Sequence, residues 1–429
     1  MRVWLVKLEE PVPLDADFRP YRMSMIADGL IKRGHHVTRW CSDFDHLNNR
    51  PRFGRACQKK VNDFYYINFV HSSIKYDKPV SLSRLLNNYL VRRNFFNMAR
   101  NEVKPDVIVC SMPTPEMARS CASLARQFNI PLILDARDMW PDVIINELSG
   151  FKLILAMPII LNMRRSLAYA CKYAFSCVGI TDFFRDYLLQ YAKRKIGKYD
   201  AVFPLGYQDK NEIIDSGELS KIKEYWCNKG VDFDSKDKYI YFAGRLNSTV
   251  ANVFSLVVDA AKILDKSRSD VKFIICGSGQ FSEKIKVLSE GVTNIILPGE
   301  IKTDQLAELR KKSFIALQPI ERRTDYQNSL SNKFFEYICS GLPVLTYLDG
   351  ITEDVVRKYG CGYKYDTGAE LAGYIEALLN DDISHNEMAN NAKKLFEEQY
   401  SAKKVYQDFA IHIENVVDEV KIGSRKEYG

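Results

Sequence analysis

The chain has 429 residues, of which 46% are hydrophobic, with only 22 glycines and 15 prolines. This length predicts two domains of about 200 residues each, and the composition excludes a disordered or fibrous protein. The net charge of +7 is uneven, since residues 1–200 hold 31 Lys and Arg against 19 Asp and Glu, and the remainder holds 30 against 35. A basic first half and an acidic second half predict different partners for the two domains.

The ten cysteines and the apolar runs indicate where the protein resides. The cysteines form no CxxC pair and no Cys/His cluster with zinc spacing, so we expect them to be reduced. The longest apolar run, residues 153–161, is far shorter than the roughly 18–20 residues that cross a bilayer. The first residues, MRVWLVKLEEPVP, predict a strand rather than a signal peptide. We therefore expect a cytoplasmic protein.

The first half alternates short apolar runs with helical patterns, which predicts a parallel, doubly wound sheet. The polar stretch 207–237 has no strong period and is interpreted as an interdomain connection. Strands are expected at Val3–Val6, Val37–Cys41, Asp106–Cys110, Pro131–Leu134, Ala174–Gly179 and Val202–Gly206, and helices at Tyr21–Arg33 and Pro115–Phe128.

A second alternating set follows and predicts a second doubly wound domain over residues 238–400. The pattern from Glu387 to about Val420 predicts one long helix. The other expected strands are Tyr239–Ala243, Val271–Cys276, Asn294–Leu297 and Phe314–Leu317, and the other expected helices are Val253–Asp265, Ser282–Ser289, Thr303–Lys312 and Leu371–Leu379.

The segment 328–347, NSLSNKFFEYICSGLPVLTY, combines a polar turn, a short helix and a strand. Ser331 or Asn332 is expected to cap the helix, so that its free N–H groups and the positive end of its dipole point outward. Such a helix end binds a phosphate or diphosphate. Glu336 lies about one turn further along, within reach of a sugar hydroxyl. An ordinary capped helix with Glu336 on its solvated face remains an equal alternative on these residues alone.

This segment resembles the nucleotide-sugar site of family 4 glycosyltransferases, which are retaining enzymes of the GT-B fold. In that family a glutamate, seven residues and a second glutamate precede a small residue, Gly, x, Pro and Val. Glu336 matches the second glutamate, and residues 340–344 match the ending. The first glutamate falls at Asn328, which is a departure. The resemblance implies two Rossmann-like domains that face each other across a cleft, with the last helix, 402–420, packing back on the first domain (1–206).

Three further strand ends in the second half match the family in order. Gly244 and Arg245 follow a strand, and a permanently charged guanidinium suits a diphosphate. The lysine that the family usually carries just after this point is absent, so Lys333, Arg245 and the helix end must supply more of the positive charge. Gly277 and Ser278 form part of a Gly-Ser-Gly turn, which permits close backbone approach to a nucleotide. The family also uses a loop like residues 298–299 to contact the base.

The first half has a charged strand end of its own, ILDARDMWPD at residues 133–142. These charges could contact a sugar or phosphate, or they could form an internal Arg–Asp pair that stabilises the loop. The DxRDxWP form resembles a subgroup that assembles bacterial surface polysaccharides, which also shows a stretch like residues 19–22 and loops like 34–38 and 111–116. In that alignment Arg137 replaces the histidine that usually contacts the donor sugar.

A basic band in the first half suggests a membrane surface. Residues 50–60 and 84–100 combine positive charge with Leu, Tyr and Phe, and the second stretch predicts a basic amphipathic helix. The alternative is a helix that packs on the core and exposes a charged outer face. Residues 151–165 are a second candidate for membrane contact. Nucleic acid is not expected as a partner, because no recognised reading module accompanies the charge.

The resemblance implies transfer of a sugar from a nucleoside diphosphate sugar to a saccharide acceptor on a lipid diphosphate, with retention, in polysaccharide biosynthesis such as O-antigen or lipopolysaccharide assembly. No cofactor or metal is expected. A peripheral contact with the inner face of the cell membrane is expected. The alternatives are a GT-B nucleotide-sugar epimerase and a non-catalytic partner subunit of a glycosyltransferase. The base, sugar, linkage and oligomeric state are left open.

The expected site residues fall into three groups. The expected catalytic residues are Arg245, Glu336, Arg137 and Asp138. The expected donor-binding residues are Gly244, Arg245, Gly277, Ser278, Pro298, Gly299, Asn328, Ser331, Asn332, Lys333 and Glu336. The expected acceptor-binding residues are Arg19, Arg22, Asp135, Arg137 and Thr114.

Overall fold

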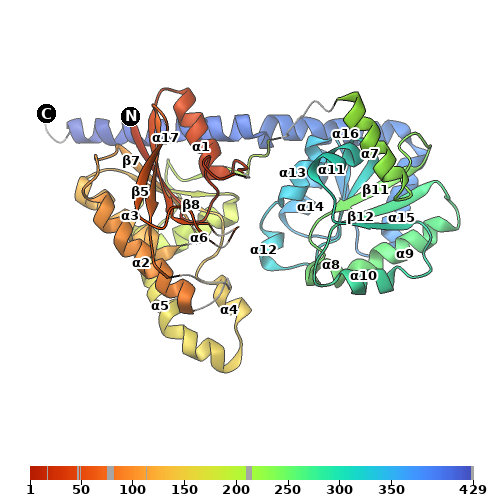
Figure 1. The fold of residues 1–429 in the computed structure, drawn as a ribbon, viewed down its shortest axis with the longest axis horizontal. Helices are drawn as coiled ribbons and strands as arrows, with labels where there is room; N and C mark the ends of the chain where they lie inside the picture. The colour runs from red at the N-terminus through yellow and green to blue at the C-terminus, as the bar shows by residue number, and fades with distance from the viewer. Residues whose placement is uncertain are drawn as a thin grey trace. The chain divides into compact units, whose positions relative to one another are not determined.

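The computed structural model describes residues 1–16, 18–45, 48, 50–74, 82–112, 114–208 and 215–426. The chain forms two compact units, the first made of Met1–Gly206 and Ala402–Gly429 and the second of Tyr207–Ser401 (Figure 1). Each unit is built on a mostly parallel sheet with helices on both faces. The predicted α/β class with two doubly wound domains is confirmed.

The first unit contains an eight-stranded sheet of order β10-β9-β8-β7-β1-β2-β6-β5, in which only β5 runs antiparallel to its neighbour. The strand expected at 202–206 is the short β10, Ala201–Val202. Its strands are β1 (Arg2–Val6), β2 (His36–Ser42), β5 (Cys57–Asn62), β6 (Tyr65–Val70), β7 (Val107–Ser111), β8 (Leu132–Ala136), β9 (Ser176–Gly179) and β10 (Ala201–Val202), and β3 (Phe44–Asp45) and β4 (Arg50–Pro51) pair separately.

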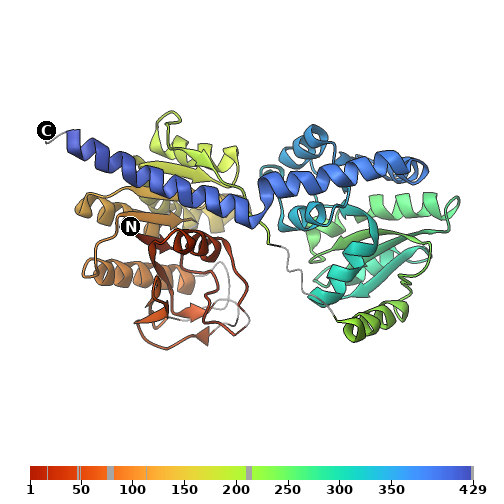
Figure 2. The same cartoon turned by 90° about the horizontal axis from the view of Figure 1, so that it is seen from above.

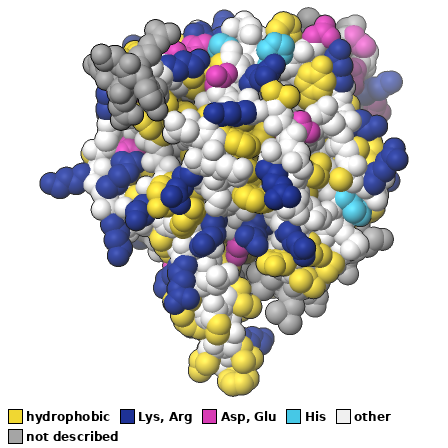
Figure 3. All heavy atoms as spheres, turned by 90° about the vertical axis from the view of Figure 1, so that its left-hand side faces the viewer, with side chains coloured by type: hydrophobic (Ala, Val, Ile, Leu, Met, Phe, Trp, Pro, Cys, Tyr) yellow, Lys and Arg dark blue, Asp and Glu magenta, His cyan; other side chains and the backbone are white. Residues whose placement is uncertain are grey.

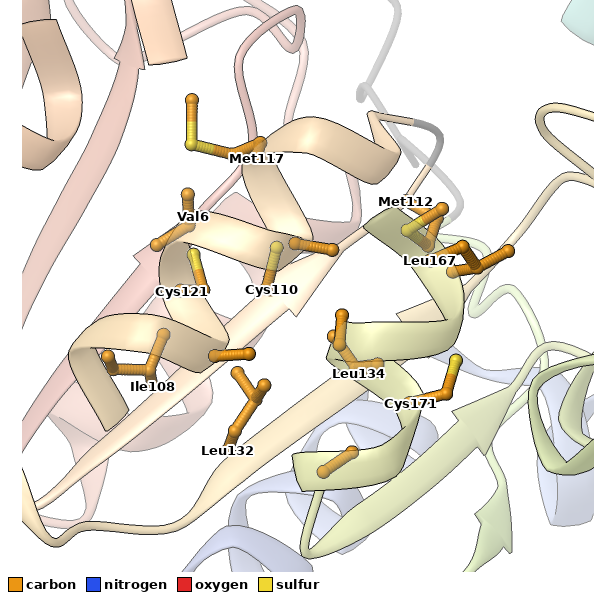
Figure 4. Packing of buried hydrophobic residues seen from close by; sticks show 14 of the residues in the cluster. Val6, Ile108, Cys110, Met112, Met117, Cys121, Leu132, Leu134, Leu167 and Cys171 are labelled. Carbon is orange, nitrogen blue, oxygen red and sulfur yellow. The ribbon is translucent and has the colours of Figure 1, made fainter. Parts of the chain in front are cut away.

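The apolar run of β1 supplies both faces of this sheet, because successive side chains alternate. Val3 and Leu5 join one core with α1 and α17, whereas Trp4 and Val6 join another with α2, α3, α5 and α6. Figure 4 shows the second core, where side chains from the sheet meet those from α3 and α5. The helices of the unit are α1 (Arg22–Lys32), α2 (Leu82–Ala99), α3 (Pro115–Phe128), α4 (Val143–Glu147), α5 (Gly150–Tyr173), α6 (Asp182–Ala192) and α17 (Ala402–Lys426).

The last helix, α17, belongs to the first unit, although the chain reaches it only after completing the second (Figure 2). Its apolar stripe includes Phe409, Ile413 and Val416, which are fully buried in the core shared with α1. The expected single helix 387–420 is two helices. A π-helical turn, Phe396–Tyr400, and the extended backbone of Ser401 (ψ 135°) separate them, which breaks the i to i−4 hydrogen bonding.

The docking of α17 predicts a pH-dependent stability. The Nε2 atom of His412 lies 3.1 Å from the Ser176 hydroxyl, and burial lowers the pKa of this imidazole to about 4. Between that value and the ordinary 6.5, the unfolded chain binds a proton that the folded chain does not, so stability rises with pH and is lost on acidification. We expect the free energy of unfolding to fall by about 1–2 kcal/mol between pH 7 and pH 5 through this group.

Urea unfolding followed by circular dichroism at both pH values measures this loss. His412→Gln should remove it, whereas His36→Gln, which changes an exposed histidine, should keep it. An unchanged pH slope in His412→Gln would contradict the assignment.

The second unit contains a six-stranded parallel sheet of order β13-β12-β11-β14-β15-β16. Its strands are β11 (Lys238–Ala243), β12 (Val271–Cys276), β13 (Ile295–Gly299), β14 (Ser313–Gln318), β15 (Val344–Thr346) and β16 (Gly362–Lys364). Its helices are α7 (Ser216–Cys227), α8 (Ser248–Ala251), α9 (Phe254–Asp265), α10 (Ser282–Leu288), α11 (Thr303–Lys312), α12 (Thr324–Gln327), α13 (Asn332–Cys339), α14 (Ile351–Tyr359), α15 (Gly368–Asn380) and α16 (Asp382–Leu395).

The stretch 207–237, expected as a connection, lies in this second unit, and α7 occupies part of it. Trp226 is fully buried there and its indole N–H donates to the carbonyl of Gln305 at 3.1 Å. This helix was not predicted, because the stretch is polar overall and the helix packs through only a few large apolar side chains.

Candidate functional site

The carboxyl ends of β11 and β12 come together so closely that only glycine fits. The Gly244 N–H donates to the Cys276 carbonyl at 2.9 Å, and the Gly277 N–H donates to the Gly299 carbonyl at 2.7 Å. A Cβ on Gly277 would lie 1.8 Å from the Gly244 oxygen, and its φ of 139° is one that other residues rarely adopt. The three strand tips, β11 to β13, therefore form one continuous edge with exposed backbone.

Helix α13 begins beside this edge. Ser331 is its N-cap, and the serine hydroxyl accepts from the Phe334 N–H at 3.2 Å. The Gln318 side chain, at the end of β14, donates to the same hydroxyl at 3.2 Å and holds the cap against the sheet. The N–H groups of Asn332 and Lys333 belong to the first turn, where a helix has no internal acceptors, so this end of the helix attracts an anion.

Lys333 places its ammonium at the tip of β11. A Cβ on Gly244 would lie 2.6 Å from Nζ, which shows how close the lysine runs to that backbone. Burial lowers the pKa of Lys333, and Glu336 only partly offsets this effect. No hydrogen bond or ion pair joins Nζ to another of the described residues. A partly desolvated cation without a counterion gains most from an arriving phosphate.

Glu336 lies one turn beyond Lys333 and is held from behind. The Arg310 guanidinium on α11 contacts its Oε2 at 3.3 Å, and the side chain is 32% exposed. The carboxylate is thus oriented by a fixed cation and still reaches solvent. This geometry suits a hydrogen bond from a hydroxyl group, because an ionised carboxylate accepts only.

The other residues expected to bind a donor line the same edge. Arg245 is exposed directly after β11 and forms no ion pair within the described part of the chain. The Ser278 hydroxyl donates to Glu300 at 3.0 Å, which fixes the turn after β12. Pro298 is buried, whereas a Cβ on Gly299 would meet open space. The backbone after β13 is therefore accessible.

The Asn328 side chain forms a hydrogen bond to a nearby backbone carbonyl. Its side-chain N–H donates to the Thr324 carbonyl at 2.7 Å, at the end of α12. The family pattern implies a carboxylate here that contacts the donor sugar. An amide that caps a neighbouring turn does not reproduce that charge.

In the first unit the expected acceptor residues Arg22 and Asp135 are bound to each other. Arg22 donates from Nε and Nη2 to the two Asp135 oxygens at 3.0 and 2.9 Å, and from Nη1 to the Pro204 carbonyl at 2.8 Å. The side chains are 1% and 0% exposed, and the rings of Tyr406 and Phe409 lie 5.9 and 5.2 Å from the guanidinium. A direct acceptor contact would require this pair to separate, and the expectation that both residues bind the acceptor stays a prediction.

Arg137 pairs internally as well, which matches the ion-pair alternative, although its partner is Glu10 rather than an aspartate. Arg39 lies 3.5 Å from the same carboxylate, and these cations lower the pKa of Glu10 in spite of its burial. Arg137 is 16% exposed, so its other edge remains near the surface. Asp138 accepts from the Met139 N–H at 2.7 Å and shapes the loop.

The two remaining expected acceptor residues lie in different surroundings. Arg19 is exposed in the segment before α1, and Thr114 is buried as the N-cap of α3 without a capping hydrogen bond from its hydroxyl. The second unit thus places most of its expected donor-binding residues at one sheet edge, whereas Arg22, Asp135 and Arg137 of the first unit are held in internal ion pairs.

The residues that hold the site were not predicted from the sequence. Arg310 holds Glu336, and Gln318 holds Ser331. Glu300 holds Ser278. Gln318 carried a usable signal, since a polar residue closes an otherwise apolar strand. Arg310 carried none, because basic residues are common in the last turn of a helix.

The model of the family "Glycosyl transferases group 1" matches residues 228–395, which lie within the second unit. No curated protein matches the chain.

Solved structures resemble the whole chain. Sucrose-phosphate synthase from Thermosynechococcus elongatus is 13% identical with a TM-score of 0.65, covering 97% of this chain and 99% of that one. HepE from Anabaena, in complex with UDP and glucose, is 14% identical with a TM-score of 0.59, covering 97% and 100%. WaaG, a glycosyltransferase involved in lipopolysaccharide biosynthesis, is 15% identical with a TM-score of 0.58, covering 95% and 98%. At these identities the likeness establishes the fold.

Proposed function

Because the chain has the GT-B fold, with two Rossmann-like domains, we propose that it is a glycosyltransferase. It transfers a sugar from a nucleoside diphosphate sugar to a saccharide acceptor carried on a lipid diphosphate. The observation that carries the proposal is the convergence of Lys333, Arg245 and the free end of α13 on one sheet edge. The match of residues 228–395 to a glycosyltransferase family model supports the same assignment.

In the proposed reaction the acceptor hydroxyl oxygen bonds to the anomeric carbon of the donor. The bond from that carbon to the diphosphate oxygen breaks, and the hydroxyl proton passes to the leaving diphosphate. Lys333, Arg245 and the α13 N–H groups stabilise the negative charge that develops on this group, so the reaction needs no metal ion. Glu336, oriented by Arg310, accepts hydrogen bonds from the ribose hydroxyls.

Retention at the anomeric carbon and a place in surface-polysaccharide assembly are part of the proposal. The DxRDxWP loop and the Glu336 segment support both, through their resemblance to retaining transferases of that group. The neighbours described in complex with UDP make a UDP-sugar the first donor to test. The excess of basic residues in the first half supports an acceptor that carries phosphate, at the cytoplasmic face of the membrane.

The test is incubation of the purified protein with radiolabelled nucleotide sugars, UDP-sugars first, with and without lipid-linked saccharides extracted from membranes. Label that enters the lipid phase only when lipid acceptor is present is the expected result, and the anomeric coupling constant of the product then reports retention. Conversion of the donor without acceptor would instead identify an epimerase. Nucleotide binding without any turnover would identify a non-catalytic partner subunit.

A further inference from the structure

Helix α5 has two halves with different surroundings. Its second half packs in the core of the first unit, where Leu167, Ala170 and Cys171 are buried. Its first half, with α4, projects from that unit as a hairpin (Figure 1). The projecting part exposes large apolar side chains that a globular unit would ordinarily cover.

Three of these side chains form what we call the apolar tip: Phe151, Ile154 and Leu155, with exposed fractions of 72%, 68% and 63%. Their spacing of three and four residues places them on one face of the helix. The opposite side of the hairpin is packed, since Ile144 of α4 meets Ile160 and other residues in a small separate core. The hairpin is therefore folded in itself, with its outer face left bare.

A strongly basic surface stands behind the apolar tip. Helices α2, α3 and α5 together contain nine Lys and Arg residues and a single acidic residue, Glu116. Figure 3 shows this side of the molecule, with Lys and Arg side chains over the face and hydrophobic side chains gathered on the projecting end. The exposed members away from the apolar tip, which we call the basic face, are Arg93, Arg119, Arg126, Arg165 and Lys172; Lys152, next to Phe151, is exposed as well.

The helix geometry separates the two features by a distance that a membrane matches. Arg165 follows Ile154 by eleven residues, or about 16 Å along a helix. A basic side chain at that distance from an apolar tip lies at the headgroups when the tip lies among the acyl chains. A second copy of the chain fits poorly, because two faces with nine basic residues against one acidic residue would repel each other.

The structure also argues against a span. By length and composition α5 is the one helix among the described residues that could cross a membrane, with mean hydropathy 1.2 and 28% of the window buried. This differs from the expectation that no apolar segment is long enough. However, Ile160, Met163 and Leu167 are buried, which leaves residues 150–159, about 15 Å of helix, against roughly 30 Å of hydrocarbon.

We propose that the apolar tip inserts into one leaflet of an anionic membrane while the basic face lies against its headgroups. The hairpin continues directly from β8 through the loop 137–142. Asp142 anchors it, accepting from Arg164 at 2.7 Å and from the hydroxyls of Tyr187 and Tyr191 at 2.7 and 2.6 Å. Insertion would hold the carboxyl end of β8 near the headgroups, where the diphosphate of a lipid-linked acceptor lies. This last step rests on the proposed function.

Flotation with vesicles of phosphatidylcholine, with and without phosphatidylglycerol, tests the insertion. The protein should float with the anionic vesicles, less with the neutral ones, and less at high salt. The triple variant Phe151→Ser, Ile154→Ser, Leu155→Ser should lower the partition coefficient on the order of 100-fold. A matched triple at exposed apolar residues of the second unit, Ile263→Ser, Val287→Ser and Ile383→Ser, should leave it unchanged.

Charge-reversal variants separate the electrostatic attraction of the basic face from the insertion of the apolar tip. Arg93→Glu, Arg119→Glu and Arg165→Glu together should weaken binding to anionic vesicles only, whereas Lys262→Glu, Lys266→Glu and Lys284→Glu, all exposed in the second unit, should have little effect. The proposal is overturned if the tip variant floats like the parent, if the parent binds no anionic vesicle, or if the tip variant only dissociates a dimer in sedimentation. Vesicle binding and nucleotide-sugar turnover are separate readouts, so failure of the transferase assignment would leave a positive flotation result intact.

Discussion

Replacing Arg245 by alanine is expected to lower kcat/KM for sugar transfer by about 100- to 1000-fold, the loss that follows removal of one preorganised donor at a developing oxyanion. Arg245 is exposed and without an ion pair among the described residues, so the variant should fold normally. Arg245→Lys should keep part of the activity, because the charge remains but the planar fork is lost.

Lys333→Ala should show a loss of similar size, since its ammonium occupies the same sheet edge and lacks a counterion. The double variant should lose less than the product of the two single effects, because both cations act on one diphosphate. Steady-state kinetics and nucleotide titration calorimetry measure these changes. Lys262→Ala, an exposed charge on α9, is the control. Near-normal turnover in Arg245→Ala would remove this residue from the site.

Replacing Asp135 by asparagine is expected to destabilise the first unit by about 3–5 kcal/mol, because it leaves the buried Arg22 guanidinium without its counterion. Both partners are almost wholly excluded from water, so solvent screening offers no relief. Urea unfolding monitored by circular dichroism measures the loss. Asp182→Asn breaks an ion pair whose carboxylate is 78% exposed and should cost less than about 1 kcal/mol.

Asp135→Asn, together with a double variant, separates a structural role of the pair from an acceptor-binding role. Replacing both partners together, Arg22→Met with Asp135→Leu, should restore most of the lost stability. If Asp135→Asn unfolds like the parent and loses only transfer activity, the pair contacts the acceptor and does not serve stability alone.

The strands that lie inside both sheets were predictable from the sequence. Val3–Val6 and Tyr239–Ala243 are continuous apolar runs, and Val271–Cys276 is interrupted only by Lys272. A strand covered by helices on both faces requires such a run. The hairpin β5–β6 was not predicted. Along β5, more and less exposed residues alternate at the sheet edge, as with Lys59 and Lys60, and such an edge carries little apolar signal.

The basic helix at residues 84–100 was predicted, but its orientation was not. Val91, Phe95 and Ala99 of α2 are buried at intervals of four, so this helix packs on the core as the alternative interpretation held. Leu86 and Tyr89 of α2 are about half exposed, and the most exposed apolar side chains of the first unit lie on α5. Its run 151–161 reads the same whether it is covered or bare, since hydropathy records side chains and not their neighbours.

The sequence by itself determined the two α/β halves, the Ser331-capped helix and the order of the glycine-bearing strand ends, because each depends on residues close together in the chain. The tertiary structure decided which charges are free. Arg22, Arg137 and Lys333 look alike in sequence, yet the first two are neutralised by Asp135 and Glu10, more than a hundred residues away, and Lys333 is left without a counterion. Ion pairing depends on distances of a few ångströms between distant segments, and only the packed sheets fix those distances.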